Sequence, residues 1–202
     1  MLNVAVLVSG GGTNLQALIN AKQNNELNHC NLALVISNKK NAYALTRAEE
    51  NNIKTKVIIK KKDMTSSDYG LLLIEELKKN NIDLIVLAGF LLILAPNVIK
   101  EYEDKIINIH PSLIPAFCGD GYYGLKVHEE VLNRGVKVTG ATVHLVNEIT
   151  DGGRILAQKA VKVMPGDTPE ILQKRVMEEA EWILLSQEVE KIAIKECEKW
   201  VQ

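Results

Sequence analysis

Short apolar runs alternate with longer amphipathic segments along the first half of the chain. Mostly apolar runs of strand length, which are typical of strands buried on both faces, span residues 2–8, 31–37, 56–59, 84–88 and 106–110. Segments with apolar side chains at helical spacing lie between them, at residues 13–24, 41–51 and 66–80, and Asn41 is a candidate cap for the second. This alternation predicts βαβ units, which build a parallel sheet with right-handed crossovers.

The pattern changes after residue 110. Prolines and glycines mark a long loop there, and residues 126–133 then predict a short helix. Residues 138–146 and 154–163 predict two longer strands on either side of a Gly-Gly turn, which favours an antiparallel pair. We therefore expect a mainly parallel sheet with an antiparallel C-terminal part.

A helix start follows the second of these strands. Thr168 supplies a capping hydroxyl, Pro169 suits the first helical position, and Glu170 places an acid in the first turn. Apolar spacing continues from there toward the C-terminus and predicts one long or broken helix. No repeat or linker interrupts the chain, so we expect residues 1–202 to form a single α/β domain.

Composition excludes several classes of protein. The 202 residues are 47% hydrophobic and 24% charged with a net charge of −1, which argues against a disordered chain and against a duplex-coating nucleic-acid binder. The opening run is too short for a secretory signal, and the longest apolar stretch, residues 84–96, is too short to span a bilayer. Three well-separated cysteines, Cys30, Cys118 and Cys197, form no disulfide framework and indicate a reducing cytoplasm.

The first predicted strand ends in a glycine-rich loop, SGGGTNL at residues 9–15, and a helix follows. Glycines let a backbone turn sharply and approach a ligand closely. Free amides at a helix start attract anions, most often phosphate. The alternative is a strand–helix turn that binds nothing, although three successive glycines exceed what such a turn requires.

The residues that this loop lacks argue against two common kinds of phosphate-binding site. It has no lysine of a Walker motif, and Leu15 stands where a dinucleotide fingerprint has its third glycine. The acid expected after the second strand is also replaced by SNKK at residues 37–40. That basic segment keeps an NADPH enzyme open as an alternative. A single phosphate, as on a sugar phosphate, fits the loop better.

Asn108 and His110 stand two residues apart at the end of an apolar strand, so their side chains share one face. The carboxyl edge of a parallel sheet is where such folds bind ligands. An amide can stabilise an oxyanion and an imidazole can carry a proton, a combination that favours acyl-transfer chemistry. The alternative is a buried structural histidine, with the asparagine serving the turn.

Other polar residues carry weaker functional signals. Asp151 precedes two glycines and, taken alone, is most simply a turn residue. We interpret His144 as a structural hydrogen-bonding residue of its strand and His128 as a residue of a short polar helix that lies at the surface or lines a loop. The histidines and cysteines show no zinc-ligand spacing, so we expect no metal.

Five motifs occur in order along the chain: SGGGTNL at 9–15, LAGF at 87–90, NIHPSLIP at 108–115, GATVH at 140–144 and DGG at 151–153. Together they resemble the phosphoribosylglycinamide formyltransferases of purine biosynthesis over essentially the whole chain. The resemblance implies a Rossmann-like, three-layer formyltransferase fold with a long C-terminal helix. It also implies transfer of the formyl group of 10-formyltetrahydrofolate to the amine of 5′-phosphoribosylglycinamide, without a metal.

The resemblance also implies roles for individual residues. The catalytic trio would be Asn108, His110 and Asp151. The ribonucleotide phosphate and ribose would be bound by Gly12, Thr13, Asn14 and Glu181, the last of which follows a one-residue insertion relative to the family. The folate would be bound by Ser66, Leu91, Leu92, Ile93, Leu94 and Asn108, with backbone groups of residues 91–94 recognising the pterin.

The chain departs from the family on the folate side. Leu92 stands where the family often has an arginine, and Ser66 lies where a basic residue is common. The nearest basic cluster in sequence is residues 60–62, which are three lysines, and we expect one or more of them to contact the folate tail. The loop at residues 118–124 (CGDGYYG) is longer than the common form and is expected to reshape the folate entrance.

Two other functions stay open at this point, a formyltetrahydrofolate hydrolase and a non-enzymatic sugar-phosphate-binding domain. Methionyl-tRNA formyltransferases share the Asn-His-Asp core but carry a further tRNA-binding domain, which we do not expect here. We expect small-molecule substrates, no nucleic-acid or membrane partner, a cytoplasmic location, and a monomer or homodimer.

Overall fold

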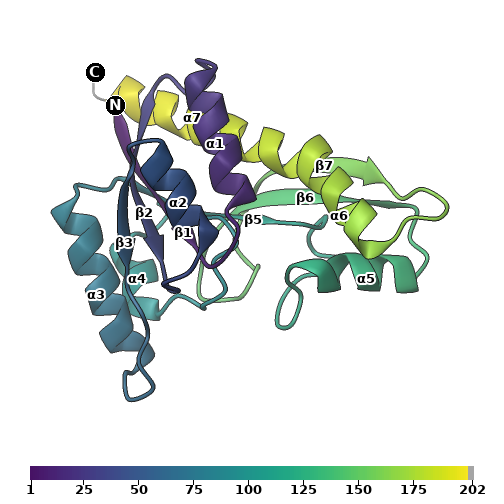
Figure 1. The fold of residues 1–202 in the computed structure, drawn as a ribbon, viewed down its shortest axis with the longest axis horizontal. Helices are drawn as coiled ribbons and strands as arrows, with labels where there is room; N and C mark the ends of the chain where they lie inside the picture. Colours follow the sequence, from purple (N-terminus) through teal and green to yellow (C-terminus); the bar gives the residue numbers. More distant parts are fainter. Residues whose placement is uncertain (200–202) are drawn as a thin grey trace.

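A seven-stranded sheet forms the centre of the protein in the computed structural model, which describes residues 1–199 and side chains as far as residue 196 (Figure 1). The strands are β1 Leu2–Val8, β2 Cys30–Ser37, β3 Lys54–Val57, β4 Leu84–Leu87, β5 Ile106–His110, β6 Val138–Leu145 and β7 Ile155–Lys162. Their order is β3-β2-β1-β4-β5-β6-β7, with parallel pairing as far as β5 and antiparallel pairing of β6 and β7. The mixed sheet predicted from the sequence is confirmed.

Helices cover both faces of the sheet, which gives three layers. The helices are α1 Thr13–Gln23, α2 Tyr43–Glu50, α3 Ser66–Lys79, α4 Pro96–Glu101, α5 Leu125–Asn133, α6 Pro169–Val176 and α7 Trp182–Lys199. Apolar side chains of α1, α2, α5, α6 and α7 pack into the core on one face, and those of α3 and α4 pack on the other. Helix α7 lies beside α1 (Figure 1). Among the described residues, no helix combines the length and the apolar character needed to cross a membrane.

Strand β1 shows why a continuous apolar run predicts a central strand. Val4, Val6 and Val8 face the core beneath α1 and α2, whereas Ala5 and Leu7 face the core beneath α3. All five side chains are fully buried because successive residues point to opposite faces of a sheet that is covered twice.

Helices α3 and α6 begin with a side-chain cap, whereas α1, α2, α4 and α5 have none. The Thr168 side chain accepts a hydrogen bond from the backbone N–H of Ile171, and Pro169 occupies the first turn, as predicted. Helix α2 instead starts after Ala42 with no side-chain cap, so the prediction of Asn41 as its cap is wrong. Strand β3 begins two residues earlier than expected, and the six-residue α4 was not predicted because it is too short to show a helical period.

A single π-helical turn, Met177–Glu181, joins α6 to α7. A π turn accommodates one more residue than an α turn. It ends at Glu181, before which the family resemblance implied a one-residue insertion. The predicted long or broken C-terminal helix is therefore a continuous helical path with one wider turn.

Candidate active site

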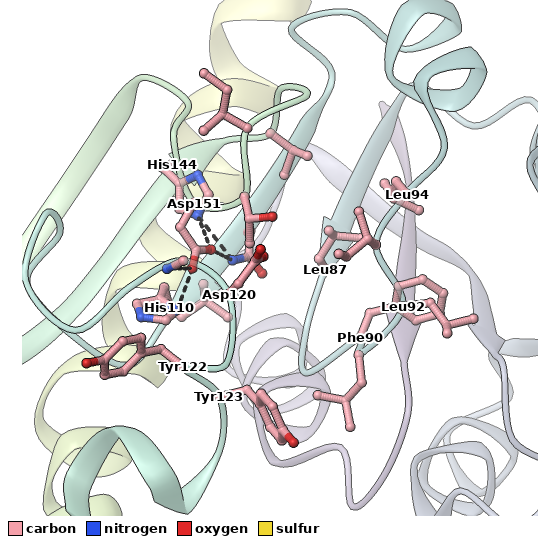
Figure 2. A pocket seen from close by; sticks show the side chains of 18 of the residues that line it. Leu87, Phe90, Leu92, Leu94, His110, Asp120, Tyr122, Tyr123, His144 and Asp151 are labelled. Atoms are coloured by element: carbon pink, nitrogen blue, oxygen red, sulfur yellow. Dashed lines mark hydrogen bonds and ion pairs between the residues drawn. The ribbon is translucent and has the colours of Figure 1, made fainter. Parts of the chain in front are cut away.

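A cavity of about 470 Å³ opens where β4 and β5 end. Its walls are formed by residues 89–94, 108–111, 119–124 and 146–151, together with Leu87, Ile99 and His144. Figure 2 shows His110, His144 and Asp151 on one side of this cavity and the side chains of leucines on the other. The cavity thus combines a polar wall with an apolar one, as small-molecule sites commonly do.

The polar wall arises from the antiparallel pairing of β5 with β6. In that register Asn108 stands directly opposite His144, and His110 stands opposite Thr142. The alternation of both strands sends their apolar neighbours, such as Ile109 and Val143, into the core on the other face. The shared face of Asn108 and His110, predicted from their spacing, is confirmed.

Both ring nitrogens of His110 face hydrogen-bond acceptors. Its Nε2 lies 2.8 Å from the Phe117 carbonyl oxygen, and its Nδ1 lies 3.5 Å from Asp151 Oδ2. Because a carbonyl can only accept, the Nε2 atom carries the proton in the neutral ring, and the Nδ1 lone pair faces the carboxylate. Burial lowers the pKa of His110, and the Asp151 carboxylate opposes that shift only in part.

Asp151 is brought to the site by the loop between β6 and β7, where it adopts a left-handed backbone conformation. Its Oδ2 accepts a hydrogen bond from the Gly119 N–H at 2.9 Å, and its Oδ1 lies 3.5 Å from His144 Nε2. Burial by itself raises the pKa of Asp151, but the histidine partners and the Gly119 N–H outweigh it, so the pKa is lowered. Asp151 is therefore a carboxylate at neutral pH. Its local sequence suggests only a turn residue, but its side chain contacts His110 and His144 in the site.

His144 is the site residue that the sequence interpretation missed. Its Nδ1 lies 2.8 Å from the Leu145 carbonyl oxygen and must carry a proton, which leaves Nε2 to accept a hydrogen bond from Asn108 Nδ2 at 3.1 Å. This contact orients the Asn108 amide so that its NH2 group also faces Asp151 Oδ1, at 3.5 Å. His144 is a hydrogen-bonding residue, as predicted, but its partner is the Asn108 side chain, which belongs to the site.

His128 is not a surface residue, contrary to the prediction. It lies on the inner side of α5 with no exposed area, and neither ring nitrogen has a hydrogen-bond partner among the described residues. Burial lowers the pKa of His128 to about 4, which keeps the ring neutral. The polar neighbours Glu129 and Glu130 made the whole helix look exposed.

The glycine-rich loop lies at the end of the neighbouring strand β1, outside the cavity lining. Gly12 has a positive φ of 72°, and a Cβ atom there would lie 2.5 Å from the Ala44 Cβ. The turn and the packing against α2 therefore require glycine at this position without any ligand. Gly10 and Gly11 are different, because an added Cβ would meet nothing within 4 Å.

Three predicted ribonucleotide-binding residues lie at the start of α1. The N–H groups of Thr13 and Asn14 precede the first intrahelical hydrogen bond, which the Gln16 N–H donates to the Gly12 carbonyl oxygen, so they have no acceptor within the helix. Asn14 Nδ2 donates a hydrogen bond of 2.8 Å to Glu181 Oε2, so the structure brings Glu181 to this loop. Burial raises the pKa of Glu181 to about 7.

The predicted folate-binding residues separate into two places. Residues 91–94 line the cavity, with Leu91 and Ile93 exposed at its rim, and Asn108 lies on the polar wall. Ser66 lies at the start of α3 and is not part of the lining, but its hydroxyl accepts a hydrogen bond of 2.8 Å from Lys60 Nζ. The loop at residues 118–124 contributes to the cavity wall from Gly119 onward.

The chain belongs to the formyl transferase family, whose sequence profile matches residues 2–187. Relatives within that family include trifunctional purine biosynthetic proteins and proteins named phosphoribosylglycinamide formyltransferase. The Haemophilus influenzae enzyme of that name is 38% identical over 179 residues, which cover 89% of this chain and 82% of that protein. The chloroplastic enzyme of Arabidopsis thaliana is 41% identical over 177 residues, and the match covers 87% of this chain but only 60% of that longer protein.

Solved structures show the same likeness. Glycinamide ribonucleotide transformylase 1 from Symbiobacterium toebii superimposes with a TM-score of 0.90 and 34% identity, covering 96% of this chain and 89% of that one. The formyltransferase fold implied by the sequence motifs is therefore confirmed.

The raised pKa of Glu181 makes a prediction about stability. The folded-state pKa of about 7 exceeds the ordinary value of 4.5, so the folded protein binds the proton more tightly than the unfolded chain. The stabilisation is fully present below pH 4.5 and is lost as the pH rises through 7, for a total of roughly 3 kcal/mol. In Glu181→Gln, urea unfolding between pH 5 and pH 8 should lose this component of the pH dependence.

The matched control is Glu179→Gln, which changes an exposed carboxylate two residues away in the same π turn. Its pH dependence should equal that of the parent. If Glu181→Gln also keeps the parental pH dependence, Glu181 titrates normally and its burial has no electrostatic consequence.

Proposed function

We propose that this protein transfers the formyl group of 10-formyltetrahydrofolate to the amine of 5′-phosphoribosylglycinamide. The observation that carries the proposal is the convergence of Asn108, His110 and Asp151 on one wall of a cavity whose opposite wall is apolar, beside the glycine-rich loop. The relatives named above support it through their names. The proposal treats residues 1–202 as one formyltransferase domain, because one sheet runs through both the loop and the cavity.

The ribonucleotide phosphate would bind at the loop formed by Gly12, Thr13 and Asn14. The N-terminal N–H groups and the dipole of α1 favour an anion at this point, and Gly10 and Gly11 leave room for it. Glu181 stands beside Asn14 and is placed to bond a ribose hydroxyl. With a pKa near 7, its carboxyl group can either donate or accept that bond.

The folate would occupy the cavity. Its flat bicyclic ring suits the apolar wall, and the exposed backbone groups of residues 91–94 can bond the polar edge of a pterin. This orientation directs the formyl group toward Asn108 and His110. No metal or redox cofactor is part of the proposed reaction.

The reaction begins when the substrate amine attacks the formyl carbon, which gives a tetrahedral intermediate with a negatively charged oxygen. The Asn108 amide has two N–H bonds, and His144 Nε2 takes one of them. The second faces Asp151 Oδ1 at 3.5 Å, and in this proposal it turns to the developing oxyanion, because such a bond is strong in a low-dielectric cavity. His144 thereby fixes the donor before the substrates arrive.

The attacking amine must lose a proton, and in this proposal His110 Nδ1 receives it at the side of the ring that faces Asp151. In the neutral ring this atom has a free lone pair, because Nε2 carries the proton toward Phe117. The imidazolium that forms lies between the Phe117 carbonyl and the Asp151 carboxylate, which both favour a positive charge. His110 can then return the proton to the departing folate nitrogen.

Holding the two substrates side by side also contributes. The glycine-rich loop and the cavity lie at the ends of adjacent strands, β1 and β4. Correct positioning of two reactants can lower a barrier by about 7–11 kcal/mol. We further propose that the protein acts in the cytoplasm on small molecules, as a monomer or homodimer, with no nucleic-acid or membrane partner.

The direct test measures consumption of 10-formyltetrahydrofolate with and without 5′-phosphoribosylglycinamide. Consumption that requires the acceptor and yields the N-formyl product supports the proposal. In His110→Ala, kcat should fall by about 10²–10⁴-fold while both substrates still bind, whereas His29→Ala, a change at an exposed histidine before β2, should not alter the rate. Consumption without acceptor would indicate a hydrolase, and failure to bind folate would indicate a sugar-phosphate-binding domain.

Gly11→Ala tests the phosphate site more cleanly than any change at Gly12. The new methyl group meets no protein atom within 4 Å, so the loop should keep its shape while the approach of a phosphate is obstructed. We expect the KM for the ribonucleotide to rise about tenfold and the KM for the folate to change little. Equal changes in both constants would show that the loop is a turn with no role in phosphate binding.

The folate tail makes a separate prediction. The Lys60 ammonium lies beside Ser66, where relatives of this chain commonly place a basic residue, and it is exposed to solvent. Lys60→Ser should raise the KM for the formyl donor by up to about fivefold at low salt, because exposed charge pairs contribute roughly 0–1 kcal/mol. Lys61→Ser and Lys62→Ser are the matched controls. If Lys60→Ser has the same salt dependence of KM as the parent, Lys60 does not contact the tail.

A further inference from the structure

The ends of three adjacent parallel strands are joined by a chain of hydrogen bonds. Ser9 is the first residue after β1, Asn38 is the first after β2, and Leu91 follows β4. The Leu91 N–H donates to Ser9 Oγ at 2.8 Å, and Ser9 Oγ donates to Asn38 Oδ1 at 2.7 Å. The order β2-β1-β4 in the sheet makes this chain run straight across the carboxyl edge.

The direction of the chain is fixed by its chemistry. A serine hydroxyl has one hydrogen, and the Asn38 carbonyl oxygen can only accept it. The lone pairs of Ser9 Oγ are then turned toward Leu91, whose backbone N–H can only donate. Ser9 is 3% exposed, so water has little access to compete for these bonds, and each bond polarises the next.

Ser9 contacts residues 89–91 through two hydrogen bonds. Besides the bond to its hydroxyl, its own backbone N–H donates to the Gly89 carbonyl oxygen at 3.1 Å. Packing holds this segment only in part: Phe90 and Leu92 are half-buried against the core beneath α3, whereas the Leu91 and Ile93 side chains are 52% and 74% exposed at the cavity rim. The first fully buried side chain at the far end of the segment is Leu94. The conformation between these ends therefore depends on hydrogen bonds as well as on this packing.

Ser9 also begins the glycine-rich loop. That loop has anchors of its own: the Gly10 carbonyl accepts from the Ala44 N–H at 3.1 Å, and the Gly11 carbonyl accepts from Arg47 Nε at 2.9 Å. Loss of the Ser9 hydroxyl should therefore disturb residues 89–94 and leave the loop in place.

We propose that Ser9, oriented by Asn38, is a positioning residue that holds the backbone of residues 91–94 in the conformation that binds the pterin ring of the folate. The identity of the ligand rests on the proposed function. The hydrogen-bond chain itself does not, and it can be tested without any ligand.

The test compares Ser9→Ala with the parent in three measurements. Hydrogen exchange of the Leu91 amide in the unliganded protein should become faster, because the amide has lost its acceptor. The dissociation constant of tetrahydrofolate, measured by calorimetry, and the KM for 10-formyltetrahydrofolate should both rise about tenfold or more. The kcat at saturation and the KM for the ribonucleotide should each change by less than about threefold.

Variants of Asn38 make the test independent of one substitution. Asn38→Asp keeps an acceptor for the Ser9 hydroxyl and should behave like the parent, whereas Asn38→Ala should weaken folate binding to an intermediate degree. Ser186→Ala is the matched control, because Ser186 is another buried serine, on α7, whose hydroxyl bonds its own helix at the Trp182 carbonyl. It should leave folate binding unchanged.

Two results would overturn the proposal: unchanged Leu91 exchange and folate affinity in Ser9→Ala, or an equal rise in both KM values together with a lower melting temperature. The second would mark Ser9 as a general stabilising residue. A parent protein that does not bind tetrahydrofolate would instead refute the proposed function, and the exchange of Leu91 would still decide whether Ser9 holds this segment.

Discussion

The antiparallel pairing of β5 with β6 determines where the polar groups of the cavity lie. A sixth parallel strand would have placed another apolar strand beside β5, whereas the reversed strand places His144 opposite Asn108. Four polar side chains are then buried together, and each supplies what another lacks: His144 orients Asn108, Asp151 faces His110, and the Gly119 N–H satisfies Asp151. Because unpaired polar groups are costly in an apolar cavity, this set is stable only when it is complete.

Much of the fold could be predicted because burial on both faces leaves a simple signal. Strands such as β1 read as unbroken apolar runs, and the period of two was enough to place Asn108 and His110 on one face. The antiparallel pairing of β6 with β7 was also predictable, from the Gly-Gly turn between them. The register of β6 against β5 was not predictable, and without that register the contact between His144 and Asn108 has no sequence signal.

Other failures have equally specific causes. Asp151 was placed in the catalytic trio only by the family resemblance, because Asp-Gly is a common turn sequence and nothing local marks the carboxylate as buried. His128 lies three residues before the buried Val131, so helical spacing placed both on one face, but two adjacent glutamates outweighed that signal. Gly12 has a structural requirement of its own, since its positive φ and the contact that an added Cβ would make with Ala44 require glycine whether or not a ligand binds.

The π turn before α7 shows how a chain can gain a residue and keep a side chain in place. In a regular α-helix of 3.6 residues per turn, one inserted residue rotates everything beyond it by about 100°. Val176 in α6 and Leu185 in α7 are both fully buried, so neither helix is free to rotate without exposing its apolar face. The π turn accommodates one more residue than an α turn without rotating either apolar face, and Glu181 within it accepts a hydrogen bond from Asn14. Core packing on both sides of the turn thus fixes the position of a residue that packing alone would not select, a buried carboxyl group beside the glycine-rich loop.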